Sequence, residues 1–228
     1  MTYRAVLFDL FGTLVPCYPL ARLDCVVQEM AGDLGVPAEP FAVEWQRTVS
    51  DQIGGRFPTL ETHLHYLLDR LCASPLAEGL VAAVERRLVL ERSALRPRPD
   101  AIPTLTHLRA QGLRAGVITN CSNETVRLWP STELASAVDH LSGSCVIRSI
   151  KPNPQIYRHA CSELAVAPNE CLFVADGSDG ELEGAMAVGM DAVLIRAADD
   201  DGSFPGRIAR CDWTGAFVSA LPQLTEFM

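Results

Sequence analysis

The sequence predicts an α/β fold, namely a doubly wound parallel sheet with an all-helical segment inserted into it. Two observations along the 228 residues predict this class. After residue 96, short apolar runs alternate with helical segments, many of ten or more residues, which is the pattern of βαβ units in a parallel sheet. Between Val15 and Leu95 the apolar residues recur at helical spacing and no alternating segment interrupts them. The length allows one large domain or a domain with an insert.

The strands of this Rossmann-like core are predicted from apolar runs that turn residues bound. They are expected at Arg4–Asp9, Arg114–Thr119, Ser144–Ile147, Cys171–Ala175 and Asp191–Ile195. Helices are expected between the strands over Asp100–Gln111, after Ser122, and from Pro154 to about Leu164. Asn153 can cap the last of these helices, and proline suits its first position.

The inserted segment is predicted to hold four helices. They are expected over Leu20–Leu34, Pro40–Ser50, Leu60 to near Ala73, and along the apolar positions Leu76 to Leu88. Arg96-Pro97-Arg98-Pro99 is expected to be extended, because a residue that precedes proline is disfavoured in a helix. The predicted boundaries are residues 1–15 and 97–228 for the core and 16–96 for the helical segment.

Composition argues against several classes of partner. The net charge of −9 disfavours nucleic acids and anionic membranes. The apolar runs are far shorter than a membrane span, and no signal-type apolar core precedes Asp9. We expect a cytoplasmic protein that acts on a small molecule, of an oligomeric state that the sequence leaves open. The eight cysteines include no Cys-x-x-Cys pair and are expected to be reduced core thiols. The acidic stretch from Ala198 to Gly206 is interpreted as a solvated turn.

The single lysine marks a candidate functional position. Of the 19 lysine and arginine residues, only Lys151 is a lysine. Arginine and lysine differ in geometry and hydration, so a site that needs a compact ammonium group would not accept arginine.

Polar side chains stand where the predicted strands end or a helix begins. They are Asp9, Thr119 with Asn120, Lys151 just before a helix, and Asp176. In a doubly wound parallel sheet these positions converge on one crevice, where such folds bind their ligands.

The four motifs resemble those of the haloacid dehalogenase (HAD) superfamily, and the helical segment stands where its cap domain is expected. The first motif of the family's phosphatases reads Asp-x-Asp-Gly-Thr, and here it reads Asp9-Leu10-Phe11-Gly12-Thr13. The resemblance implies a hydrolase in which Asp9 is the nucleophile and forms a covalent aspartyl intermediate. It implies that Thr119 hydrogen-bonds the transferring group and that Lys151 neutralises charge. It also implies substrate contacts from Gly12, Thr13 and Asn120.

The resemblance further implies a Mg²⁺ ion. Its expected ligands are Asp9, the backbone carbonyl of Phe11, Asp176 and Glu181. A hard cation held by oxygen atoms would offset the repulsion between a phosphate and a carboxylate nucleophile. Glu181 stands where a second aspartate often lies, and Asp179 is a further candidate. Ser178-x-x-Glu181 could instead be a capping box that opens a helix.

Phe11 replaces the aspartate that serves HAD phosphatases as general acid and base, a role that typically contributes about 10²–10⁴-fold. A residue of the helical segment could take over that role, and the candidates are Tyr18, Asp24, His63 and His65. Alternatively, the substrate has a leaving group that needs no acid, or the reaction is not phosphoryl transfer.

Three functions are therefore open. The first is a Mg²⁺-dependent phosphatase of a small phosphorylated metabolite. The second is a metal-independent 2-haloacid dehalogenase, since that group also carries an aromatic residue at the position of Phe11. Against it, the fourth motif is acidic and Pro40 stands near the position where the group has an arginine. The third is a binding protein on a degenerate HAD scaffold. Phosphonate cleavage through a Schiff base would need a lysine in the helical segment, which has none.

Overall fold

The computed structural model describes residues 3–197 and 212–228. The stretch from Ala198 to Gly206, interpreted above as a solvated turn, lies outside the described residues.

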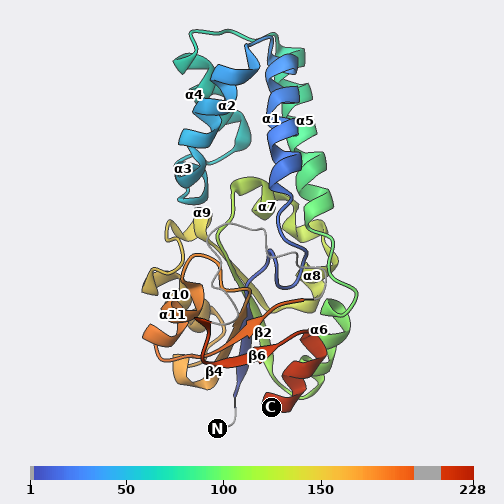
Figure 1. The fold of residues 1–228 in the computed structure, drawn as a ribbon, viewed down its shortest axis with the longest axis vertical. Coiled ribbons are helices and arrows are strands. Elements are labelled where there is room, and N and C mark those ends of the chain that lie inside the picture. Colours follow the sequence, from blue (N-terminus) through green and yellow to red (C-terminus); the bar gives the residue numbers. More distant parts are fainter. Residues whose placement is uncertain (1–2, 198–211) are drawn as a thin grey trace.

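The core is a six-stranded parallel sheet with the strand order β3-β2-β1-β4-β5-β6, which confirms the predicted fold class (Figure 1). The strands are β1 (Ala5–Phe8), β2 (Arg114–Thr119), β3 (His140–Gly143), β4 (Cys171–Ala175), β5 (Asp191–Ile195) and β6 (Ala216–Val218). The chain runs outward from β1 to β3 and then returns to β4 on the other side of β1. The strand order therefore reverses between β1 and β4, the point at which doubly wound sheets bind ligands.

One predicted strand is wrong. Ser144–Ile147 is the short helix α9, and β3 ends just before it at Gly143. β2 ends at Thr119, which pairs with Gly143, so no partner backbone remains for residues after Gly143. The run is also amphipathic, because Cys145 is buried whereas Val146 is 62% exposed. The three-residue strand β6 was not predicted, because it is too short to give a periodic signal.

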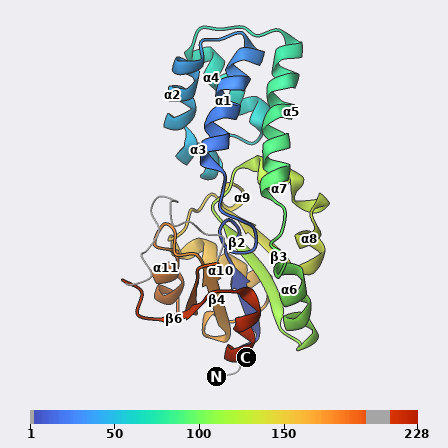
Figure 2. The same cartoon turned by 45° about the vertical axis from the view of Figure 1, so that its right-hand side comes forward.

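Helices cover both faces of the sheet, as the alternation of its side chains requires. Val6, Phe8 and Val174 point to the face that packs against α6 (Ala101–Ala110), α8 (Glu133–Ala137) and the 3₁₀ segment η4 (Leu221–Phe227). Leu7, Phe173 and Ala175 point to the opposite face, which α10 (Pro154–Glu163) and α11 (Glu181–Ala187) cover. The turned view separates the two layers (Figure 2). The shorter elements are α7 (Asn123–Leu128), η1 (Trp129–Ser131) and η2 (Pro168–Glu170).

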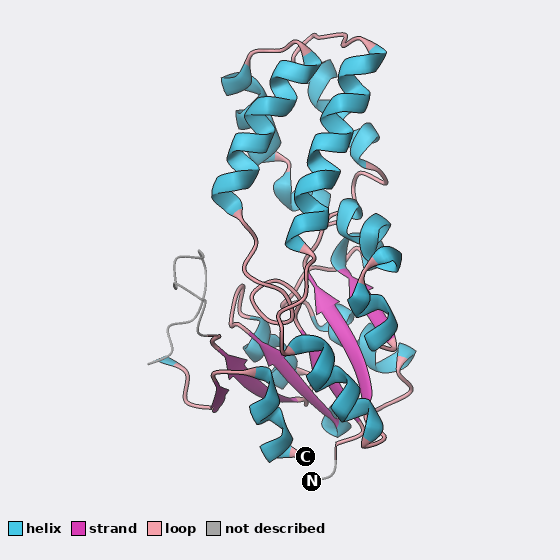
Figure 3. Cartoon of the chain, turned by 90° about the vertical axis from the view of Figure 1, so that its right-hand side faces the viewer, coloured by secondary structure: helices cyan, strands magenta, loops and turns pink. Residues whose placement is uncertain are grey.

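The residues between β1 and α6 form a helical insert, here defined as α1–α5. Its helices are α1 (Leu20–Leu34), α2 (Ala38–Arg47), α3 (Val49–Ile53), α4 (Leu60–Arg70) and α5 (Ala77–Ala94). All five lie together beyond the ends of the strands, and this part of the molecule has no strand (Figure 3). The predicted second helix is split at Thr48, whose hydroxyl donates to the carbonyls of Glu44 and Trp45 at 3.0 and 2.9 Å. Such back-bonding bends or ends a helix.

Two further predictions concern the state of the cysteines and the lack of a membrane-spanning segment. The cysteines within the described residues are free thiols, and Cys121, Cys145, Cys161 and Cys171 are buried, whereas Cys25 and Cys72 are exposed. Among the described helices none is both long enough and apolar enough to cross a membrane.

Candidate active site

Asp9 lies directly after β1, beside the central strand β4. Its amide donates to the carbonyl of Val174 at 2.9 Å, which fixes the end of β1 against β4. The chain then turns through Gly12, whose φ of 91° lies in the left-handed region that glycine adopts without strain. This turn brings the hydroxyl of Thr13 to 3.3 Å from Asp9 Oδ2. The first motif is thus a tight loop that holds the buried Asp9 carboxylate at the crevice.

Lys151 is buried and contacts two carboxylates. Its Nζ lies 2.5 Å from Asp9 Oδ1 and 2.5 Å from Glu181 Oε2. Burial alone would lower the pKa of Lys151, but Asp9 and Glu181 outweigh it and raise that pKa. The side chain of Asn120 holds the backbone of Lys151 in place, because its Oδ1 accepts the backbone N–H of Lys151 at 2.8 Å. The only lysine of the chain therefore has the central place that its position in the sequence predicted.

Asp9, Asp176 and Glu181 form a cluster of buried carboxylates, with one oxygen of each within 4.8 Å of the others. Together with Lys151 we call them the strand-end cluster. These four side chains together carry a formal charge of −2, and the Arg196 guanidinium lies beside them, where its Nη1 donates to the backbone carbonyl of Asp176 at 2.9 Å. Burial is the main reason that the pKa values of Asp9 and Glu181 are raised. Oxygen donors with excess negative charge suit a hard divalent cation such as Mg²⁺.

The fourth motif orders its carboxylates through its own backbone. Asp176 Oδ1 accepts the amide and the hydroxyl of Ser178 at 2.9 and 2.6 Å. Glu181 Oε1 accepts the amides of Gly177 and Ser178 at 3.0 and 3.1 Å. Only one half of the capping box is therefore formed. Glu181 accepts the Ser178 amide, but the Ser178 hydroxyl donates to Asp176, and α11 begins after Gly180. Asp179 is exposed and lies outside the carboxylate cluster.

Tyr157 supports this motif and was missed from the sequence. Its buried hydroxyl donates to the backbone carbonyl of Glu181 at 2.8 Å. The residue falls on the apolar stripe of α10, so sequence periodicity assigns it to the core and gives no sign of the hydrogen bond.

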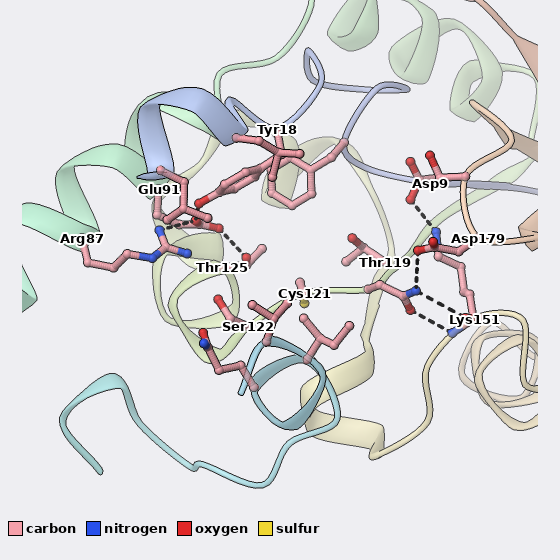
Figure 4. Close-up of a pocket in the computed structure, with 18 of the residues that line it drawn as sticks. Asp9, Tyr18, Arg87, Glu91, Thr119, Cys121, Ser122, Thr125, Lys151 and Asp179 are labelled. Carbon is pink, nitrogen blue, oxygen red and sulfur yellow. Dashed lines mark hydrogen bonds and ion pairs between the residues drawn. The ribbon is translucent and has the colours of Figure 1, made fainter. Parts of the chain in front are cut away.

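A cavity of about 220 Å³ opens between the strand-end cluster and the helical insert. Asp9, Thr119, Asn120 and Lys151 line it from the core (Figure 4). Tyr18, Arg87 and Glu91 line it from the insert and the segment leading to it. Gly12 and Thr13 shape the loop below but are not among the lining residues, so their substrate contacts stay predictions. The same holds for the metal contact of the Phe11 carbonyl.

None of the four residues predicted as substitute acids directs a proton donor toward the space beside Asp9, where the leaving group would lie. Tyr18 is the one of the four that lines the cavity, with its ring edge-on to Phe11 at a centroid distance of 5.0 Å. Its hydroxyl, however, points away from Asp9 and donates to Glu91 at 2.8 Å (Figure 4). His63 is buried and bonds to the Thr48 hydroxyl at 2.8 Å. Asp24 and His65 are exposed and do not line the cavity.

A second set of buried charges, the junction cluster, lies where the insert meets the core. It consists of Arg87 and Glu91 on α5 and Glu124 on α7. Arg87 Nη1 lies 2.8 Å from Glu91, and its Nε lies 3.4 Å from Glu124. The hydroxyls of Tyr18 and Thr125 also donate to Glu91. This cluster was not predicted. Its only signal in the sequence is the spacing of Arg87 and Glu91, four residues apart, which is also common on solvated helix faces.

The chain is similar in sequence and in fold to known proteins of one family. The model of the haloacid dehalogenase-like hydrolases matches residues 3–189. Glyceraldehyde 3-phosphate phosphatase from Methanopyrus kandleri is 33% identical over 202 residues, which are 85% of this chain and 84% of that protein. (S)-2-haloacid dehalogenase 1 from a Pseudomonas species is 28% identical over 240 residues, covering 97% and 96%. The crystal structure of a HAD phosphatase from Thermococcus onnurineus superposes with a TM-score of 0.62 at 26% identity, covering 100% of this chain and 97% of that one. The sequence motifs, the parallel sheet and these matches agree that the chain belongs to the haloacid dehalogenase-like hydrolase family.

Proposed function

We propose that this hydrolase is a Mg²⁺-dependent phosphatase of a small phosphorylated metabolite, with the helical insert acting as a cap over Asp9. The observation that carries the proposal is the excess of buried carboxylates over cations in the strand-end cluster. The glyceraldehyde 3-phosphate phosphatases and phosphoglycolate phosphatase among the relatives support it. Under this proposal residues 16–96 form the cap, and residues 1–15 and 97–228 form the core.

Each residue has a role that follows from its position. Asp9 attacks the phosphorus atom, since its carboxylate is held by Thr13 and Lys151 at the end of β1. Lys151 neutralises Asp9 and the incoming phosphate, and Thr119 is placed at the cavity wall to donate to a phosphate oxygen. Asn120 fixes the Lys151 backbone. Mg²⁺, held by Asp9, Asp176, Glu181 and the Phe11 carbonyl, would lower the repulsion between the phosphate and Asp9.

A metal-independent dehalogenase is the second candidate, favoured by the aromatic Phe11 and by the similarity to (S)-2-haloacid dehalogenases. Its substrate is a carboxylate. Three buried carboxylates with a single lysine would repel that substrate, because an uncompensated charge in a buried site is costly. The acidic Asp176 and Glu181 therefore favour the phosphatase.

Two assays run side by side test the proposal. One measures phosphate release from a panel of phosphate monoesters with Mg²⁺, and the other measures halide release from 2-haloacids with EDTA. We expect phosphate release that EDTA abolishes. Halide release without metal would contradict the proposal and establish the dehalogenase. Silence in both assays would favour a degenerate scaffold.

A further inference from the structure

Most of the cavity wall beside the strand-end cluster is apolar, which bears on the substrate. Six apolar side chains come from the first motif and the insert: Phe11, Leu20, Leu23, Trp45, Val49 and Ile53. The ring of Tyr18 also lines the cavity, edge-on to Phe11 at a centroid distance of 5.0 Å. Aromatic rings pack favourably against such a wall, at about 25 cal/mol per Å² of apolar surface removed from water. The cavity therefore fits a substrate whose body is apolar and flat.

The cations that line the described cavity are already paired. Lys151 contacts Asp9 and Glu181 at 2.5 Å each. Arg87 contacts Glu91 at 2.8 Å. A second anionic group on the substrate would have to break one of these pairs, and it would also face Glu91 or the lining residue Asp179. Leaving a buried charge without its partner is costly, so the cavity disfavours bisphosphates and phosphorylated carboxylates.

Among the described residues that line the cavity, none is a general acid placed at the leaving group. Phe11 has no proton to give, and the Tyr18 hydroxyl is committed to Glu91. The Glu91 carboxylate accepts from Arg87 and from two hydroxyls, so it is held as an acceptor. Asp179, the other lining carboxylate outside the strand-end cluster, accepts a hydrogen bond from Asn120 Nδ2 at 3.4 Å. Without an acid, the bonding electrons must leave on an oxygen that is stable as an anion. A phenol has a pKa of about 10. An aliphatic alcohol has a far higher pKa, close to that of water, so its anion is a much poorer leaving group.

We propose that the substrate is an aryl phosphate, the phosphate monoester of a phenol, with no second anionic group. This inference rests on the proposed phosphatase function. In the first step an Asp9 oxygen bonds to phosphorus, and the bond from phosphorus to the phenolic oxygen breaks. The electron pair leaves with the phenolate, which takes a proton from water. In the second step water attacks the phosphorus, the bond to Asp9 breaks, and the proton of that water passes to solvent. Inorganic phosphate and the Asp9 carboxylate result.

Phenyl phosphate and cyclohexyl phosphate form the matched pair for the test. They have similar size and equal charge but differ in leaving group, and phosphoglycolate adds a carboxylate. The quantity to compare is kcat/KM with Mg²⁺, because it reports the steps up to departure of the leaving group. We expect phenyl phosphate to exceed both others by at least about 10²-fold, the lower range for a missing acid. Equal or faster turnover of cyclohexyl phosphate or phosphoglycolate would overturn the inference and leave the phosphatase standing. No phosphate from any substrate would overturn both.

The variant Phe11→Asp tests the missing acid directly, and Phe11→Asn is its matched control of nearly equal size without an acidic proton. Phe11→Asp should raise kcat/KM for cyclohexyl phosphate by about 10²–10⁴-fold over Phe11→Asn. Equal values for the two variants would mean that another group supplies the proton. Asp179→Asn tests the lining carboxylate that could supply the proton instead. A selective loss of cyclohexyl phosphate turnover in this variant would make Asp179 that acid and overturn the inference.

Binding without turnover gives a second readout. Phenylphosphonate cannot be hydrolysed, and it carries the aryl group without a carboxylate, whereas phosphonoacetate carries the carboxylate without the ring. We expect phenylphosphonate to be the tighter competitive inhibitor by about tenfold or more, since one buried ring contributes well over 1.4 kcal/mol. Tighter inhibition by phosphonoacetate would overturn the inference.

Discussion

In the described part of the chain, two buried clusters of charge face the same cavity, and their positive and negative charges are balanced differently. The strand-end cluster sets three carboxylates against Lys151. The junction cluster sets Glu91 and Glu124 against Arg87, and two hydroxyls complete the shell of Glu91. The former lies at the ends of strands β1 and β4, and the latter joins α5 to α7. We infer that the strand-end cluster does chemistry with a cation, whereas the junction cluster holds the insert against the core.

The largest effect on activity is expected when the strand-end cluster loses the carboxylate of Asp9, the proposed nucleophile. Asp9→Asn keeps the shape of the side chain but removes the attacking carboxylate. We expect phosphatase activity to fall on the order of 10⁴-fold or more, as when a covalent nucleophile is lost. Steady-state phosphate release measures this, and circular dichroism checks that the variant is folded. Activity within tenfold of the native chain would refute the role of Asp9.

Replacing Lys151 tests how strongly the charge of the strand-end cluster affects stability and Mg²⁺ binding. Lys151→Met removes the cation that contacts the buried carboxylates of Asp9 and Glu181, which should cost about 3–5 kcal/mol of unfolding free energy. The formal charge of the cluster changes from −2 to −3, so added Mg²⁺ should recover more stability in this variant than in the native chain. Denaturant unfolding with and without Mg²⁺ measures both effects.

Lys151→Arg is the matched control, because it keeps the charge but not the compact ammonium group. It should lose less stability than Lys151→Met. A Mg²⁺ effect in Lys151→Met no larger than in the native chain would speak against a cation in the strand-end cluster.

His63, which is buried on α4 in the insert, provides a test by the pH dependence of stability. Burial lowers its pKa from 6.5 to about 4. The unfolded chain therefore binds the proton first as pH falls. The stability that neutral His63 contributes is fully present above about pH 6.5 and is lost as pH falls toward 4. The loss amounts to about 3 kcal/mol at 1.36 kcal/mol per pKa unit.

His63→Gln has no such titration, so unfolding curves at about pH 7 and about pH 4 should show a smaller drop in the variant by that amount. Equal drops in both proteins would show that His63 is not buried in its neutral form.

Tyr18→Phe should have the smallest effect. It removes one hydroxyl that donates to Glu91, which typically costs about 1 kcal/mol of stability. If Tyr18 only braces the junction cluster, kcat/KM should change by less than about threefold. A drop of about 100-fold, restricted to alkyl phosphates, would instead identify Tyr18 as the missing general acid.

Four of the six described strands, β1, β2, β4 and β5, and the polar residues at the ends of β1, β2 and β4 could be predicted from the sequence, because each is encoded by a local pattern. β2, β4 and β5 have the predicted bounds, and Asn153 caps α10 by accepting the amide of Gln155. β3 could not be placed, since its end is set by pairing with β2 and not by its own residues.

The contacts of the site depend on long-range packing and left little local signal. Arg87 and Glu91 had the pattern of an exposed helix face, yet packing against α7 buries them. The hydrogen bond from Tyr157 to Glu181 joins residues 24 positions apart, so no motif records it. The direction of the Tyr18 hydroxyl likewise depends on Glu91, which lies 73 positions further along the chain.

Titration calorimetry with Mg²⁺ tests the central claim most directly, with Asp176→Asn as the matched control that removes one carboxylate of the strand-end cluster. We predict one Mg²⁺ per chain in the native protein and at least about tenfold weaker binding in the variant, as a lost ligand charge entails. No Mg²⁺ binding to the native chain, or equal binding to both proteins, would contradict the assignment of the strand-end cluster as a metal-dependent phosphatase site.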